Sequence, residues 1–560
     1  MRLGNTARVR LLALIALLTL LAAACGGGGT GGTDDASDDS SAAPAESEPA
    51  EPAEEETDAA AGGGEDGVVV VGTLEKPSTI DPAEVYELMA SNLLYNVADT
   101  LVQLEPGTGE VAPGIAEKWV VSKDAKTYTF TLREGVKFHD GSDLTSEDVK
   151  WSLERSININ HPESAAFLIS SIESIETPDD TTVEITIAEP NVTFLSRLSY
   201  TVATILPSDS DVYEAPKKAL GKGGEPPAVE EAEKFIQGEQ IVGSGPYEMT
   251  SYSPDTGATL EAFDGYWGEA PLSSTIKLQF FESAAQMTNA LKNAEIDVNV
   301  NDLGPAERSA LENEEGLVVE QGAAGRTRYI VLDVTQEPFK DPEVRRAISA
   351  NIDRQRIVDE VFEGAGEVLT SMIPPSYEAS DQEAIANASG EVSDGPIKFD
   401  LWYPLNKYGD TEPDVAETIA RSLNESGDFD VTTKSSDWAA EYSANLNNGT
   451  YSAYLLGWYP DYIDPDDYIE PFYHSEKTFI GFYGDPAMDK LIAAEQEETD
   501  EAKRADIFAD IQTKAAEDMP FIPLYSEVTH AYYGEDICGV EHSIDVALHA
   551  RWYKIGRGGC

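Results

Sequence analysis

Short apolar segments with strand character alternate with segments of helical period along the second half of this chain. Residues 276–281 and 296–300 have the pattern of buried strands, and residues 283–294 between them have the pattern of a helix. The same alternation returns at residues 397–402 and 413–426. Strands that alternate with helices are typical of α/β units whose strands lie parallel in one sheet. The sequence therefore predicts an α/β fold with a largely parallel sheet in its second half.

The first half of the chain mixes such units with strands of hairpin type. Tyr128, Phe130 and Leu132 alternate with threonines, as expected of a strand with one buried face. Thr145, followed three residues later by Asp148, resembles a helix capping box. At 560 residues the chain is too long for one core of ordinary size, so we expect two or more lobes.

An aromatic and acidic run, LLGWYPDYIDPDDY, occupies residues 455–468. The apolar residues at 454–456 predict a short buried strand that Gly457 ends, and ligands of α/β proteins bind in loops just beyond such strand ends. The aromatic side chains of the loop are Trp458, Tyr459 and Tyr462. With the carboxylate of Asp461 they offer a stacking surface and a counter-charge for an ammonium group. A solvated acidic turn is the alternative, because Asp-Pro pairs commonly begin turns.

The chain carries a strong excess of acidic residues, with a formal net charge of -65. Such a charge argues against nucleic acid as a partner and against adsorption to an anionic membrane through basic patches. A cationic or zwitterionic ligand is compatible with it. The excess also fits a surface adapted to salt, because dissolved ions screen the repulsion between exposed charges.

The N-terminus has the features of an export signal. Three arginines precede an apolar run at residues 11–21, which is too short to span a bilayer as a helix. The sequence AAAC follows at residues 22–25 and resembles a bacterial lipobox, in which the cysteine is acylated. We therefore expect a signal peptide at residues 1–24 and a lipidated Cys25. An ordinary cleavage site before an incidental cysteine is the alternative.

A polar segment separates this signal from the folded body. Residues 26–66 contain no lysine, arginine or aromatic residue, so they cannot bury enough apolar surface to offset the entropy of ordering. We expect a disordered acidic linker that begins at Cys25 and ends at residue 66. The other cysteines, Cys538 and Cys560, lie near the C-terminus of an exported chain, where a disulfide is plausible. Two unpaired thiols are the alternative.

Five blocks of sequence resemble one known family. Residues 116–155, AEKWVVSKDAKTYTFTLREGVKFHDGSDLTSEDVKWSLER, resemble the block that marks the extracellular solute-binding proteins of family 5, the peptide- and nickel-binding receptors of ABC importers. The resemblance continues in the same order through GSGPY (243–247), PFKDPEVRRAISANIDRQRIV (338–358), GWYPDYIDPDDY (457–468) and DMPFIPLY (518–525). It covers nearly the whole body from about residue 67.

The resemblance implies an α/β, two-lobed periplasmic-binding-protein-like fold of the class II type, with an extra subdomain in lobe I. By analogy, lobe I is about 67–320, with the extra subdomain at about 108–235. Lobe II is about 321–525, and residues 526–560 return to lobe I. The ligand is expected to be buried between the lobes as they close.

The resemblance also implies roles for particular residues. In peptide-binding members, the aspartate of a Gly-Trp-x-x-Asp run pairs with the ligand's α-ammonium; this position is Asp461, and Trp458 would line a side-chain pocket. In dipeptide receptors an arginine and a tyrosine hold the ligand carboxylate; here Lys407 and Tyr408 stand in the corresponding stretch. Lysine lacks the two-pronged guanidinium, which argues against strict dipeptide specificity. Tyr86 approaches the cleft on the first loop of lobe I. A surface position for Lys407 and simple packing for Tyr86 are the alternatives.

Together these features predict a lipid-anchored extracytoplasmic receptor that captures oligopeptides or dipeptides and delivers them to the permease subunits of an ABC importer. We expect a monomer at the cell membrane, periplasmic or on the outer face of the cytoplasmic membrane, with no cofactor. An oligosaccharide or a nickel complex is the alternative ligand, although the six histidines show no metal-binding spacing. A secreted hydrolase is the remaining alternative, against which the chain lacks a Gly-x-Ser-x-Gly elbow and a His-Glu-x-x-His motif.

Overall fold

The computed structural model describes residues 67–105, 109–161, 164–208, 241–300, 303–386, 389–390, 392, 395–405, 407–476, 482–545 and 547–558. The predicted signal peptide, Cys25, the acidic linker and Cys560 lie outside these residues, and so does most of the predicted loop at 208–234. Among the described residues, no helix combines the length and the apolar character that a membrane span requires.

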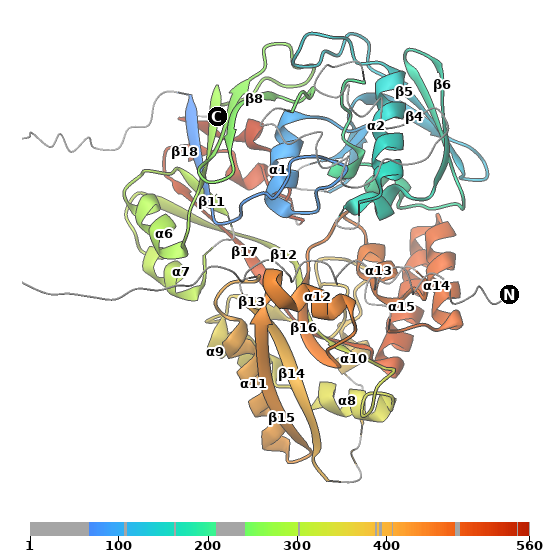
Figure 1. Cartoon of the computed structure of the whole chain (residues 1–560), viewed down its shortest axis with the longest axis vertical. Helices are drawn as coiled ribbons and strands as arrows, with labels where there is room; N and C mark the ends of the chain where they lie inside the picture. The colour runs from blue at the N-terminus through green and yellow to red at the C-terminus, as the bar shows by residue number, and fades with distance from the viewer. Residues whose placement is uncertain are drawn as a thin grey trace, which may run out of the picture. The chain divides into compact units, whose positions relative to one another are not determined.

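A mixed sheet of 11 strands forms the centre of the fold in the described part of the chain. Its strands in spatial order are β15 (Phe429–Asp437), β14 (Ile397–Leu405), β16 (Ala453–Trp458), β12 (Leu317–Leu332), β17 (Phe521–Gly534), β11 (Val298–Val300), β1 (Val68–Thr73), β10 (Thr275–Phe280), β9 (Gly257–Ala262) and β8 (Tyr247–Ser253), and β13 (Gly366–Val368) pairs with β17. The long strands β12 and β17 therefore join the strands of the second half of the chain to those of the first (Figure 1).

The directions of these strands correct one expectation. β14 is parallel to β15 and to β16, but β12 is antiparallel to both of its neighbours, β16 and β17. The prediction of a largely parallel sheet in the second half was wrong. The reason is that β12 and β17 pair as two long antiparallel strands from Leu317↔Gly534 to Val331↔Phe521, with a register shift between Gly322 and Arg326.

Several helices begin with side-chain caps, among them the capping box predicted at Thr145. The helices of the described residues are α1 (Leu88–Val97), α2 (Ser146–Ile159), α3 (Phe194–Arg197), α6 (Ala284–Lys292), α7 (Pro305–Leu311), α8 (Pro342–Ala350), α9 (Arg354–Val361), α10 (Gln382–Ala386), α11 (Glu412–Ser426), α12 (Ser443–Asn447), α13 (Glu470–Tyr473), α14 (Pro486–Glu497) and α15 (Glu501–Asp518). The Asp341 carboxylate accepts a hydrogen bond from the Glu343 N–H and caps α8. At α2 the Asp148 carboxylate accepts one from the Thr145 N–H, at 2.8 Å, as the capping box predicts.

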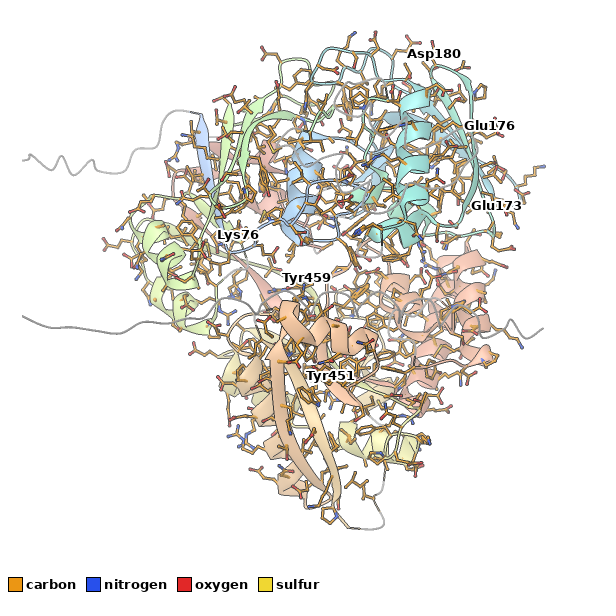
Figure 2. All side chains as sticks on the ribbon, viewed as in Figure 1. Lys76, Glu173, Glu176, Asp180, Tyr451 and Tyr459 are labelled. Atoms are coloured by element: carbon orange, nitrogen blue, oxygen red, sulfur yellow. The ribbon has the colours of Figure 1, made fainter. Side chains whose placement is uncertain are left out.

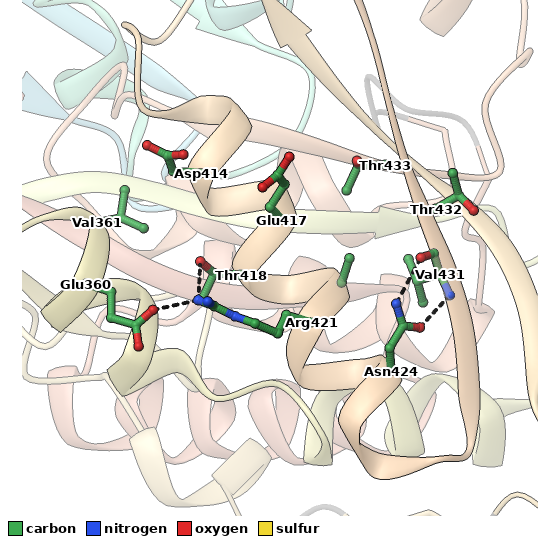
Figure 3. Close-up of a pocket in the computed structure, with 11 residues that line it drawn as sticks. Glu360, Val361, Asp414, Glu417, Thr418, Arg421, Asn424, Val431, Thr432 and Thr433 are labelled. Atoms are coloured by element: carbon green, nitrogen blue, oxygen red, sulfur yellow. Dashed lines mark hydrogen bonds and ion pairs between the residues drawn. The ribbon is translucent and has the colours of Figure 1, made fainter.

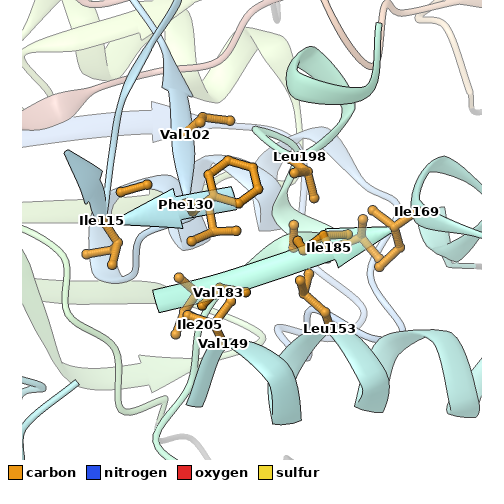
Figure 4. Close-up of a cluster of buried hydrophobic side chains, with 14 of the residues drawn as sticks. Val102, Ile115, Phe130, Val149, Leu153, Ile169, Val183, Ile185, Leu198 and Ile205 are labelled. Carbon is orange, nitrogen blue, oxygen red and sulfur yellow. The ribbon is translucent and has the colours of Figure 1, made fainter. Parts of the chain in front are cut away.

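A smaller antiparallel sheet belongs to the first half of the chain. It consists of β4 (Ala116–Val121), β5 (Thr127–Leu132), β7 (Thr182–Ile187) and β6 (Ile172–Asp179), next to the pair β2 (Val102–Leu104) and β3 (Val111–Pro113). Phe130, Val183 and Ile185 point from this sheet toward Val149 and Leu153 of α2 (Figure 4). Tyr462, from the acidic loop after β16, belongs to the same buried cluster. A residue of the second half thus completes a core of the first half.

Other core clusters distribute differently along the chain. One contains Val69 and Ile276 together with Val540, Trp552 and Ile555, so the C-terminal segment packs on the core of β1. Two others consist entirely of residues between Tyr329 and Tyr525. The exact lobe boundaries stay a prediction.

Candidate ligand-binding site

The acidic loop begins one residue later than the sequence predicts. Gly457 does not end the strand, because β16 continues through Trp458 and pairs Gly457 with Arg328 of β12. A Cβ atom at residue 457 would lie 2.5 Å from Arg328 Nη1 and 3.0 Å from Tyr408 Cε1. The glycine therefore makes room for two side chains from other strands and loops.

Arg328, which is buried, and Tyr408, which is half-buried, stack beside Gly457. The Arg328 guanidinium lies 3.6 Å from the centre of the Tyr408 ring and pairs with the Glu412 carboxylate. The Tyr408 hydroxyl accepts a hydrogen bond from the Gly457 N–H at 3.0 Å. Burial raises the pKa of Glu412 to about 7, although Arg328 acts in the opposite direction. Tyr408, a predicted ligand contact, is thus fixed next to the strand that leads into the acidic loop.

Asp461 is buried, and no described lysine, arginine or histidine forms an ion pair with it. Asp461 is only 4% exposed. Its Oδ2 accepts a hydrogen bond from the Tyr86 hydroxyl at 2.9 Å. Burial raises the pKa of Asp461 to about 7, opposed by the Tyr86 hydrogen bond and by the positive charge of Arg197. Asp461 forms no ion pair with the residues that the structure describes. A buried carboxylate of this kind calls for a positively charged partner.

The loop that carries Tyr86 is held by a buried ion pair. Both carboxylate oxygens of Asp81 accept hydrogen bonds from the Arg155 guanidinium, one of them at 2.6 Å from Nη1. The same carboxylate accepts one from the Ala83 N–H at 2.9 Å, and the Asp81 carbonyl accepts one from the Val85 N–H. These contacts form a tight turn just before Tyr86. Tyr86 as a residue remains 37% exposed, while its hydroxyl donates a hydrogen bond to Asp461.

The other aromatic residues of the loop pack inward. Trp458 is 8% exposed, lies edge-on to Phe472 at 5.1 Å, and donates a hydrogen bond from Nε1 to Asp467. Tyr462 is fully buried and donates from its hydroxyl to Asp466 at 2.9 Å. Both rings therefore stabilise the loop, and a direct contact of either with ligand stays a prediction.

Tyr459, which is labelled in Figure 2, lines a small cavity of about 50 Å³. The cavity is bounded by the end of β1, by α1, by Arg326 and by C-terminal residues including Leu548 and Trp552. The Arg326 guanidinium lies 5.5 Å from the centre of the Tyr459 ring and pairs with Glu527 at 3.1 Å. A volume of about 50 Å³ holds one or two water molecules and no peptide. A peptide would therefore require the surrounding elements to move apart.

Sequence reasoning missed three arginines at this site. Arg326 and Arg328 alternate with Thr327 immediately before the apolar residues 329–332, a signal that could have indicated them. Arg197 of α3 pairs with Asp466 at 2.6 Å and with Glu470, so it joins the smaller sheet's region to the acidic loop. Burial pushes the pKa of Asp466 upward, but Arg197 and other hydrogen bonds lower it to about 2.

Lys407 is exposed, and its ammonium lies 4.8 Å from the centre of the Trp438 ring. A second, open hollow of about 720 Å³ lies between α9, α11 and β15 and contains none of the predicted site residues (Figure 3). Its lining carries the surface ion pair of Arg421 with Glu360. Cys538 is disulfide-bonded, whereas Cys560 lies outside the described residues, so the pairing of these two stays a prediction. Within the described residues, no group of three or more His, Cys, Asp or Glu is arranged to hold a metal ion.

Comparisons with known proteins identify relatives of the chain. The family model described as "Bacterial extracellular solute-binding proteins, family 5 Middle" matches residues 110–479. The di/tripeptide-binding protein 3 of Pseudomonas aeruginosa is 27% identical over 488 residues, which cover 80% of this chain and 87% of that protein. The dipeptide-binding protein of Escherichia coli is 28% identical over 407 residues, or 67% of this chain and 72% of that protein.

Solved structures share the fold. The periplasmic binding protein DppA from Helicobacter pylori, in complex with the peptide STSA, has a TM-score of 0.73 at 23% identity and covers 88% of this chain and 98% of its own. NikZ from Campylobacter jejuni, in complex with Ni(L-His), has a TM-score of 0.70 at 19% identity, with 88% and 100% covered. The predicted two-lobed α/β fold of periplasmic binding proteins is confirmed. The predicted family is confirmed as well: the chain belongs to the bacterial extracellular solute-binding proteins of family 5.

Proposed function

We propose that this protein captures a peptide between its two lobes and delivers it to the permease of an ABC importer. The observation that carries the proposal is the buried carboxylate of Asp461, held by Tyr86 from a loop 375 residues away and without a cation among the described residues. The names of the curated relatives, which refer to dipeptides and tripeptides, support the same class of ligand.

Burying a charge costs free energy. A carboxylate in a water-poor site loses its hydration and recovers that free energy only from a cation with good hydrogen-bond geometry. The α-ammonium of a peptide offers three N–H donors for this purpose. Tyr408 and Lys407 are the proposed contacts of the carboxylate end, and Trp458, Tyr459 and Tyr462 shape the surface between the two ends.

Binding of this kind requires the protein to open and close. The cavity beside Tyr459 is far smaller than a peptide, so we infer that the closed arrangement forms around the ligand. Movement of the backbone at the register shift between Gly322 and Arg326 of β12 would separate the two lobes. The contacts that would break are Tyr86 with Asp461 and Arg197 with Asp466.

We further propose that Cys25 carries the lipid that anchors the protein to the cell membrane as a monomer, and that Cys538 pairs with Cys560. Mass spectrometry of the intact mature protein tests both covalent features. A mature N-terminus other than an acylated Cys25, or a free thiol at residue 560, would contradict the respective proposal.

The binding proposal is tested by native mass spectrometry of the protein as it is purified, followed by calorimetry with the peptides found. We expect co-purified peptides, and a loss of affinity of about 100-fold for Asp461→Asn, because truncating one partner of a buried charge pair costs roughly 2–5 kcal/mol. Asp410→Asn, at an exposed acid of the same half, is the matched control and should bind like the wild type.

Chemical variants of the ligand separate the alternatives. N-acetylation of the peptide should reduce its affinity for the wild-type protein about as much as Asp461→Asn reduces that of the free peptide. Binding of oligosaccharides or of nickel-histidine in preference to every peptide would overturn the assignment of the ligand. Release of amino acids from bound peptides would indicate a hydrolase instead.

A further inference from the structure

Asp467 accepts a hydrogen bond from the backbone of Asp461, the proposed ammonium anchor. It lies in the short 3-10 helix η5 (Pro465–Tyr468) and is completely buried, with 0% exposure. Its Oδ2 accepts hydrogen bonds from the Trp458 indole N–H and from the Asp461 backbone N–H, both at 3.0 Å. Its Oδ1 is buried without a hydrogen-bond partner among the described residues. One carboxylate oxygen thus positions both Trp458 and Asp461, and no described residue donates a hydrogen bond to the other.

The surroundings offer the two acids little positive charge. The titratable and charged groups that face the pair are Tyr86 and Tyr95 of the first loop and helix, Arg197 and Tyr200 after the smaller sheet, Tyr377, and Tyr462, Asp466 and Tyr468 of the acidic loop. Arg197 is the one cation of this group, and it already pairs with Asp466 and Glu470. Two adjacent buried carboxylates without a counter-ion of their own cannot both be ionised at modest cost.

We propose that Asp461 and Asp467 act as one paired acidic site, which keeps a proton while no ligand is bound and exchanges it for the ammonium of the ligand. The inference rests on the proposed function and adds a coupling between peptide binding and protons. In the exchange, the ligand retains the three protons of its ammonium and the carboxyl pair releases its proton to solvent. Asp467 is a positioning residue in this scheme, since it acts through Asp461.

The direction of the coupling follows from the charge balance. Burial raises the pKa of Asp461, and burial together with the Asp461 charge raises the pKa of Asp467 well above its usual range. An incoming ammonium stabilises the ionised pair, so affinity rises as pH rises through the pKa of the pair. Exchange of one proton for each ligand changes affinity by at most about tenfold for each pH unit. The rise ends near pH ~8, where peptide amines lose their own proton.

The experiment uses a fully randomised tetrapeptide library, with free or N-acetylated amino ends, and measures its retention by the purified protein at pH 6 and pH 8. We expect the wild-type apparent affinity for free peptides to rise about tenfold or more between the two pH values. Asp467→Asn keeps an oxygen for both hydrogen bonds and removes the second acid, so its affinity should rise less than that of the wild type over the same pH interval. Asp410→Asn should follow the wild type.

A second measurement needs no ligand. An acid whose pKa is raised in the folded state binds more protons there than in the unfolded chain, so its contribution lowers stability as pH rises. The urea midpoint of the wild type should therefore fall more between pH 6 and pH 8 than that of Asp467→Asn.

The outcomes separate the two proposals. Equal pH dependence of wild type and Asp467→Asn, in both retention and urea midpoint, overturns the paired site while peptide capture stands. If the wild type retains free and acetylated peptides equally at both pH values, the proposed ammonium anchor fails, whereas a difference in the urea midpoints still supports the proton shared by Asp461 and Asp467.

Discussion

Replacing Arg155 by methionine tests how the site's first loop is held. The change removes the guanidinium that binds both carboxylate oxygens of Asp81, and both residues of this pair are almost completely buried. Among the described residues, the Ala83 N–H would then be the remaining hydrogen-bond donor to the buried Asp81 carboxylate. Breaking a buried pair from one side typically costs about 3–5 kcal/mol.

Urea unfolding followed by tryptophan fluorescence measures this cost. With a slope of about 3 kcal/mol per M, the expected loss lowers the unfolding midpoint by about 1 M or more. Arg421→Met is the matched control, because Arg421 and Glu360 form an ion pair on the surface, where such pairs contribute little. Its midpoint should stay close to that of the wild type.

The double variant Asp81→Asn/Arg155→Met shows whether the orphaned charge is the cause. Asparagine keeps an acceptor for the Ala83 N–H and removes the charge, so the double variant should recover about 1–3 kcal/mol of the loss. The reasoning is refuted if Arg155→Met unfolds at the same urea concentration as the Arg421 control, or if the double variant is less stable than Arg155→Met alone.

Two further changes probe the site itself. Tyr86→Phe removes the hydroxyl that donates a hydrogen bond to Asp461. Peptide binding should weaken about tenfold, because a hydrogen bond to a charged group contributes roughly 1.5 kcal/mol. Unchanged affinity in calorimetry would show that Tyr86 does not support Asp461 in binding the ammonium. Gly457→Ala places a methyl group 2.5 Å from Arg328 Nη1. It should lower the free energy of unfolding, measured in urea, by about 1–3 kcal/mol. An unaltered urea midpoint would mean that Arg328 and Tyr408 can shift freely.

Local features of the fold were predictable from the sequence. The caps at Asp341 and Thr145 depend on residues within one helical turn, and the alternation around Phe130 reports the burial of one face of its own strand. Asp461 could be singled out because an acid between aromatic residues is visible in a short run of sequence. These interactions are local, so the pattern of neighbouring residues determines them.

The interactions that assemble the site are not local and left no such pattern. Tyr86 meets Asp461 across 375 residues, and Tyr462 completes a core built from the smaller sheet. The need for glycine at residue 457 comes from Arg328 and Tyr408, which approach from other elements. Antiparallel pairing of β12 with β16 and β17 likewise depends on strands far apart in the chain. Periodicity indicates that a face is buried, but it does not specify which distant segment covers that face.

The packing of the C-terminal segment against β1 has a consequence for synthesis. The core that contains Val69 also contains Trp552 and Ile555, which the ribosome adds after the whole segment from Tyr329 to Tyr525. The segment from Tyr329 to Tyr525 has cores of its own and can consolidate earlier on the emerging polypeptide. A premature stop codon shortly after Tyr525 would therefore yield a product with an apolar face left open near its N-terminal strand, a target for chaperones and proteases.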